Sequence, residues 1–280
     1  MHHVGDALIR IGPVLVIVMV VLAGVAVAVN VASSGYGRDT AIAVVRATVQ
    51  LTALAAVLAV VIGHLWASVL FIVLMSLTAA WTAATRITKD RRPFRDTLWC
   101  LLPAAVPTAV IMLAVVAAGV VPAAGIAIIP TAGIMLGNAM IATSLAGRHS
   151  LDDLTTRRGE VDAALSLGFS SRDARMEVVR PAAATALIPG IDQTRSVGLV
   201  TIPGSFVGMV LGGASTTVAA VMQLFVLIAL LAVSAIAVLG TTELVSRGLL
   251  GVHVAKAEAA DGPRRPLRGR HSPPRADRSR

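Results

Sequence analysis

The stretch EVDAALSLGFSSRDARMEVVRP, from Glu160 to Pro181, is the long polar passage between hydrophobic segments of this chain. Its first half has small or apolar side chains at helical spacing, acidic side chains near its amino-terminal end, and a glycine where a helix would end. The residues that carry this pattern are Glu160, Asp162, Ala163, Ala164, Leu167 and Gly168. The pattern predicts a short amphipathic helix, a glycine turn and a second helix. Such a helix either docks on a partner protein or packs on its own chain, and the stretch alone leaves both interpretations open.

The composition of the whole chain indicates what class of protein contains this stretch. Of the 280 residues, 56% are hydrophobic and 14% are charged, and the mean hydropathy is +0.82. Apolar runs repeatedly reach the roughly 20 residues that cross a bilayer. An ordinary soluble domain is therefore excluded, and the sequence predicts an all-α polytopic membrane protein in contact with lipid. The single cysteine, Cys100, excludes an internal disulfide and a cysteine-based zinc site.

About seven transmembrane helices are expected. The apolar runs cover about 11–32, 40–62, 65–84, 98–121, 124–146, 183–203 and 217–240. We expect the first run to be a retained span rather than a signal peptide, because no convincing small-residue cleavage site follows it. An odd number of spans places the two ends of the chain on opposite sides of the membrane.

Basic residues predict the orientation of these spans. The formal net charge of +9 lies mostly in loops and a tail beside the spans, which the positive-inside rule explains better than nucleic-acid binding does. A cytoplasmic central loop, about 148–182, puts the basic loop from Arg86 to Arg95 on the same side. The amino terminus is then outside and the carboxyl terminus in the cytoplasm. We expect residues 1–250 to form the transmembrane domain and the Arg- and Pro-rich tail, 251–280, to be disordered.

Polar and helix-breaking residues gather in the fifth and sixth expected spans. The polar or polarizable side chains are Thr131, Met135, Asn138, Asp192, Gln193 and Arg195, and the expected helix breaks are Pro130, Pro189, Gly190, Pro203 and Gly204. Freed backbone carbonyls and a polar stripe could coordinate a cation, which predicts a substrate pathway between these two spans. Two structural alternatives stay open: Asn138 only hydrogen-bonds to a neighbouring helix, and Asp192 and Arg195 form an ion pair that only lets their helix pack. Specific metal ligands stay unassigned.

Spacing within the polar stretch carries a resemblance. Asp162-Ala163-Ala164 is followed after three residues by Gly168, and nine residues later comes the run Val178 to Pro181. This arrangement resembles the EAA loop of bacterial ABC importer permeases. In that family the loop forms two short helices on the cytoplasmic face, and the first helix docks in a groove of the ATPase subunit. The resemblance implies that the six residues named above form an ATPase-coupling surface.

Four further stretches point to a narrower family. They are Arg46-Ala47 with Gln50-Leu51, AAWTAATR (79–86), IPTAGIMLGNAMIA (129–142) and ALIPGIDQTRSVGLVTIPG (186–204). Together they resemble the Fet-type iron-export ABC permease family, which includes plant aluminium-tolerance permeases, over about 46–223. The resemblance implies a permease of the cell membrane that exports iron or a related metal cation, pairs with a second copy, and uses ATP and Mg²⁺ bound by a separate cytoplasmic ATPase. Family members have a Met-Met pair where this chain has Ser205 and Phe206.

The sequence does not favour an enzyme. No phosphate-binding loop of the form G-x-x-x-x-G-K-[ST] occurs, so this chain needs a partner for ATP-driven transport and is expected to bind no cofactor itself. No H-E-x-x-H motif or cysteine-rich metal motif occurs either. The alternative to an ABC permease is a secondary transporter driven by an ion gradient, with Asp192 as the coupling carboxylate.

Overall fold

The computed structural model describes residues 12–33, 35–61, 63–88 and 94–251. The helices are α2 (Pro13–Ser33), α3 (Gly37–Val61), α4 (Leu65–Thr88), α5 (Phe94–Ala117), α6 (Gly125–Thr156), α7 (Arg158–Ser166), α8 (Ser171–Ala184), the 3₁₀ turn η1 (Thr185–Leu187), α9 (Ile188–Ser196), α10 (Gly204–Leu211) and α11 (Thr216–Ser246). No strand occurs among these residues, so the predicted all-α class is confirmed. The basic tail beyond Gly251 and most of the basic loop after Thr88 lie outside the described residues.

Six helices in the described part of the chain are long and apolar enough to cross a membrane: α2, α3, α4, α5, α6 and α11. They coincide with six of the seven expected spans, which confirms a polytopic membrane protein. Both α6 and α11 exceed 30 residues. Because a helix rises about 1.5 Å per residue, these two extend beyond the roughly 30 Å hydrocarbon core.

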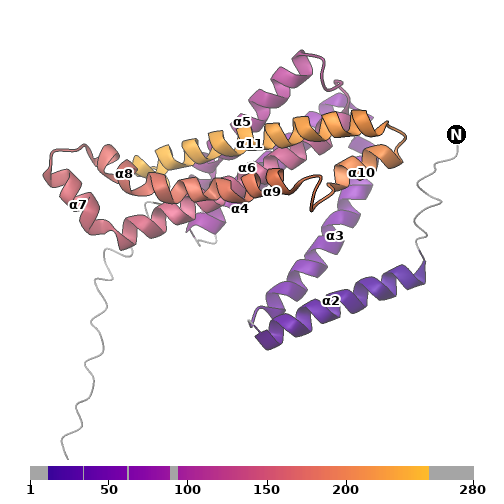
Figure 1. The fold of residues 1–280 in the computed structure, drawn as a ribbon, viewed down its shortest axis with the longest axis horizontal. Helices are drawn as coiled ribbons and strands as arrows, with labels where there is room; N and C mark the ends of the chain where they lie inside the picture. Colours follow the sequence, from indigo (N-terminus) through magenta and orange to yellow (C-terminus); the bar gives the residue numbers. More distant parts are fainter. Residues whose placement is uncertain (1–11, 34, 62, 89–93, 252–280) are drawn as a thin grey trace, which may run out of the picture.

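The expected sixth span, about 183–203, is not one helix. The helix begins earlier, at Ser171, runs through α8, η1 and α9, and ends at Ser196; a non-helical segment, 197–203, then precedes α10. We call α9, this segment and α10 the broken passage. In Figure 1 the chain from α8 to α10 runs alongside α11 in the direction opposite to α11, and the broken passage covers its half from the middle of the bundle to the α10 end.

Three of the expected helix breaks are corrected by the structure. Helix α6 continues through Pro130. Pro189 and Gly190 lie within the first turn of α9, where a proline is tolerated because its missing N–H would have no helical partner, and only η1 disturbs the helix before them. The interruption instead comes at 197–203, and Pro203 and Gly204 stand where α10 begins.

Small side chains make the bundle compact. Its core joins α4, α5, α6, α8 and α11 through buried alanines such as Ala83, Ala139 and Ala237. Gly147 of α6 shows why small residues are needed, because a Cβ there would lie 2.6 Å from Cδ1 of Ile87 on α4. The α2–α3 hairpin, in contrast, projects from this bundle (Figure 1), and α2 has no buried residue.

Candidate functional site

The polar stretch folds into two helices, α7 and α8, at one end of the bundle, with a tight turn between them. Helix α7 ends in a Schellman motif: the N–H of Phe169 donates to the carbonyl of Ala164 at 3.2 Å, and that of Gly168 to Leu165 at 3.0 Å. Gly168 has φ +91°, a backbone conformation that side-chain-bearing residues rarely adopt. The predicted glycine turn is therefore present, and we call residues 158–173 the corner.

The start of α8 is fixed by side-chain caps. The hydroxyl of Ser170 accepts from the backbone N–H of Asp173 at 3.2 Å and donates to the carboxylate of Asp173 at 2.7 Å. The hydrogen bond from Ser170, which is the largest cause, and a further one from Arg172 lower the pKa of the Asp173 carboxyl group. The corner therefore leads into α8 at a defined angle.

A forked ion pair ties the corner to the last long helix. Arg172 donates from Nε and one terminal nitrogen to the two carboxylate oxygens of Glu243 on α11, at 2.8 and 2.6 Å. Its other terminal nitrogen donates to Asp173 at 2.8 Å. Arg247, which caps the end of α11, also bonds to Glu243. Two parallel bonds fix both the distance and the orientation of the corner relative to α11.

A second ion-pair group holds the other side of the corner. Arg157, between α6 and α7, bonds to Glu160 at 2.8 and 2.6 Å and to Asp153 of α6 at 3.4 Å. The hydrogen bond from Arg157 lowers the pKa of the Glu160 carboxyl group, and the bond to Glu160 is the largest cause that raises the pKa of Arg157. Glu160, a predicted coupling residue, thus helps to set the angle between α6 and α7.

The corner exposes apolar side chains between these two ion-pair groups. Leu167 is 79% exposed and Phe169 50%, and α7 contains no buried residue. Of the other predicted coupling residues, Asp162 and Ala163 are exposed and Ala164 is half-buried. Sequence reasoning missed Leu165 and Phe169, both exposed. Phe169 follows the glycine and so lies outside the helical periodicity, and only its position beside the turn could have indicated it.

The predicted pathway residues of α6 differ in burial and hydrogen bonding. Met135 is fully buried in the core beside Met112 and Val233, and its place in a substrate pathway stays a prediction. The hydroxyl of Thr131 donates to Ala127 within its own helix, and the amide of half-buried Asn138 donates to Ile134 at 3.4 Å. Neither bond crosses to another helix.

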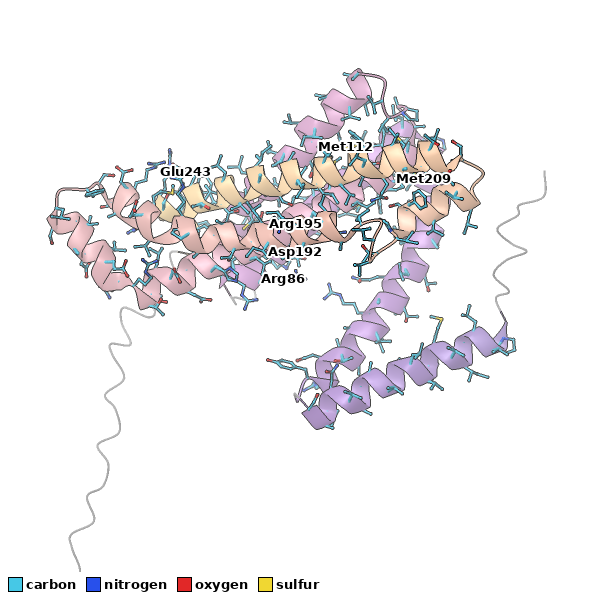
Figure 2. All side chains as sticks on the ribbon, in the orientation of Figure 1. Arg86, Met112, Asp192, Arg195, Met209 and Glu243 are labelled. Carbon is cyan, nitrogen blue, oxygen red and sulfur yellow. The ribbon has the colours of Figure 1, made fainter. Side chains whose placement is uncertain are left out.

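The polar residues of α9 face outward instead. Asp192, Gln193 and Arg195 are all exposed, and an Arg195 guanidinium nitrogen lies 4.0 Å from a carboxylate oxygen of Asp192. Figure 2 shows Asp192 and Arg195 midway along the bundle, far from Glu243 at its end. Beyond the break, the hydroxyl of Ser205 donates to the buried side chain of Gln223 on α11. The broken passage is thereby attached to α11 on its α10 side.

Metal ligands do not cluster in the described part of the chain. Among those residues, no group of three or more His, Cys, Asp or Glu side chains could hold a metal ion.

Comparison with known proteins gives a consistent set of relatives. Residues 13–250 match the sequence model described as "Uncharacterised protein family (UPF0014)". The chain is 38% identical to the UPF0014 membrane protein STAR2 of Oryza sativa subsp. japonica over 137 residues, which are 49% of this chain and 48% of that protein. It is 28% identical to the "Probable iron export permease protein FetB" of Escherichia coli (strain K12) over 202 residues, 71% of this chain and 76% of FetB.

A third relative extends the match over more of both chains. The UPF0014 membrane protein YjkA of Bacillus subtilis (strain 168) is 27% identical over 223 residues, which cover 79% of this chain and 88% of YjkA. The alignment spans only about half the length of STAR2 and 44% of the plant protein ALUMINUM SENSITIVE 3. No solved structure matches the chain at a significant level.

Proposed function

Because this chain belongs to the UPF0014 family of membrane proteins, we propose that it is the transmembrane permease subunit of an ABC transporter and exports iron or a related metal cation. ATP and Mg²⁺ bind to a separate cytoplasmic ATPase, and two permeases assemble with two ATPases. Export and the iron substrate rest on the name of the FetB relative. The coupling mechanism rests on the corner.

One observation carries the proposal: the corner holds an exposed apolar surface at a fixed angle at one end of the bundle. Leu167 and Phe169 expose apolar area to water, which is unfavourable unless a partner covers them. The ion pairs on both sides of the corner hold this surface in place before a partner binds. A preformed apolar surface suits docking, because little conformational entropy is lost on binding.

Arginines support a cytoplasmic location for the corner. The contact of Gly147 with Ile87 and the bond from the Gly251 N–H to Asp96 bring the α4–α5 connection to the same end of the bundle as the corner. The arginines at this end include Arg86, Arg95, Arg157, Arg158, Arg172, Arg175 and Arg247. The described connections at the opposite end, 63–64, 118–124 and 212–215, contain no arginine or lysine. With the positive-inside rule, the corner is cytoplasmic, the amino terminus outside and the carboxyl terminus inside, in the cell membrane.

A secondary transporter is the second candidate, because Asp192 is exposed midway along the bundle. Its carboxylate, however, already has a guanidinium nitrogen of Arg195 as a counter-charge, 4.0 Å away. The corner also has no role in such a mechanism. We therefore retain the ABC permease as the conclusion.

Co-purification tests the proposal. The tagged chain, extracted from its native membranes, is expected to carry a soluble ATPase that contains the phosphate-binding loop. Phe169→Asp places a charge on the docking surface and should release the ATPase. Phe94→Asp is the matched control, because Phe94 is also an exposed aromatic residue at the same end of the bundle. Equal ATPase recovery with both variants would exclude the corner as the docking surface.

A further inference from the structure

The broken passage interrupts its helix within the membrane, as its contacts with α11 show. A Cβ on Gly190 would lie 3.7 Å from Leu231, the middle residue of α11, and Ser205 bonds to Gln223. The non-helical segment 197–203 therefore lies beside residues 223–231 of α11. Those residues are inside the charge-free stretch 218–240, which is about 34 Å long at 1.5 Å per residue and so matches the hydrocarbon core.

This non-helical segment is uncovered in a single chain. Gly198 has φ +82°, and Leu199, Val200 and Ile202 are 90%, 83% and 70% exposed. The N–H groups of residues 198–201 donate to carbonyls within this turn. Irregular backbone facing lipid nevertheless does not occur at this depth; it is found where protein or water covers it. Helix α2 is also exposed, but it is continuous and apolar, so lipid can cover it.

Uncovered charges occur on the same passage. The side chains of Asp192 and Arg195 are 64% and 79% exposed, and the 4.0 Å between them allows only a weak pairing. A charged side chain at the centre of a bilayer costs roughly 2.5–3.5 kcal/mol on insertion scales. The broken passage thus combines two features that lipid does not tolerate.

We propose that a second copy of this chain covers the broken passage, around a two-fold axis along the membrane normal, with Asp192 of each copy opposite Arg195 of the other. The two opposite charges lie on one helix face, three residues or about 4.5 Å of rise apart, so this surface carries both charges and can complement itself in an isologous contact. The exposed turn from Leu199 to Ile202 then packs against the same turn of the other copy. This inference deepens the proposed pair of permeases and rests on it, and it places the substrate path between the copies beside this charge cluster.

Disulfide cross-linking tests the contact in membranes. In a Cys100→Ala background, which removes the single native cysteine, Leu199→Cys is expected to form a cross-linked dimer on mild oxidation. Leu113→Cys is the control, because Leu113 is 73% exposed but lies on the continuous helix α5. A Leu199→Cys chain that stays monomeric while an aqueous maleimide labels it would overturn the proposal, since water would then cover the segment. A cross-link to a different protein would also overturn it.

Complementation between two chains tests the charge exchange and needs no cysteine substitution. An Asp192→Arg chain carries two cations at this position, and an Arg195→Asp chain carries two anions. When differently tagged copies are co-expressed, the mixed pair is expected to form in preference to either like pair. If mixed and like pairs formed in equal amounts, the proposed ion pairs between Asp192 of one copy and Arg195 of the other would be excluded. The two side chains would then pair only within one chain. Both tests are read without the ATPase, so their failure is distinguishable from the failure of ATPase docking.

Discussion

The corner and the broken passage are both interruptions of helix, but they differ in how completely one chain stabilises them. At the corner, the Schellman motif, the Ser170 cap and the pairs made by Arg157 and Arg172 satisfy most polar groups, and apolar side chains remain exposed. At the broken passage, charges and irregular backbone are exposed at membrane depth. A surface whose polar groups are already hydrogen-bonded is stable without a partner, so it suits a partner that binds reversibly. The broken passage needs a permanent covering, because its uncovered groups are incompatible with lipid.

Breaking the turn of the corner should give the largest effect. Gly168→Pro cannot reach φ +91°, since proline is held near −65°. We expect ATPase stimulation to be lost while membrane insertion and pairing of the two copies persist. Gly168→Ala should give an intermediate loss, because the left-handed conformation costs about 1–2 kcal/mol with a side chain. Gly159→Ala, within α7, is the control that should keep stimulation. Normal ATPase stimulation by the proline variant would remove the corner from the mechanism.

Removing the anion of the broken passage should give the next largest effect. Asp192→Asn leaves Arg195 without a partner, at a cost of roughly 2.5–3.5 kcal/mol per chain. The amount of protein inserted in the membrane should fall, and Arg195→Gln in the same chain should restore part of it. Asp152→Asn, on an exposed carboxylate outside the apolar stretch, should leave the amount unchanged. Full insertion and full transport by Asp192→Asn alone would contradict a structural need for the charge.

Loosening the connection between the corner and α11 should give a moderate effect. Arg172→Lys keeps the charge but cannot form two parallel bonds with Glu243. We expect the ATPase to bind as before while transport per ATP hydrolysed falls severalfold, which separates coupling from docking. Arg158→Lys is the matched control, because Arg158 is exposed at the same end. An unchanged ratio of transport to ATP hydrolysis would exclude Arg172 as a route from the corner to α11.

Acid should weaken the corner slightly, and this is the smallest expected effect. Folding lowers the pKa of Glu160 from its ordinary value of 4.5 and that of Asp173 from 3.8, through Arg157 and through Ser170 with Arg172. Their stabilising contribution is therefore complete above these ordinary values and is lost as the pH falls through the lower values of the folded protein. Hydrogen exchange at the backbone of 158–173 should rise as the pH decreases from 5 to 3, after correction for the intrinsic rate. Glu160→Gln should remove part of this dependence, and an unchanged dependence would contradict the assignment.

The corner could be predicted from sequence because its signals are local. Gly168 ends a helix by its own conformational freedom, and the small residues before it have helical spacing. The sequence predicts breaks at Pro189-Gly190 and at Pro203-Gly204. A proline in the first turn of a helix interrupts little, whereas the segment 197–203, which contains Gly198 with positive φ and ends at Pro203, is not helical. Periodicity put Met135 on a polar stripe. It could not show that α5 and α11 cover that side chain, because packing partners distant in sequence leave no local signal.

Transport by purified components tests the central claim most directly. The chain and its ATPase are reconstituted in vesicles with the corner facing the medium, and Fe²⁺ accumulation inside is followed after ATP or an ion gradient is supplied. We predict that accumulation requires ATP and both proteins, and that Gly168→Pro abolishes it while the chain remains inserted. Accumulation by this chain alone, driven by an ion gradient without ATP, would contradict the account and establish the secondary transporter instead.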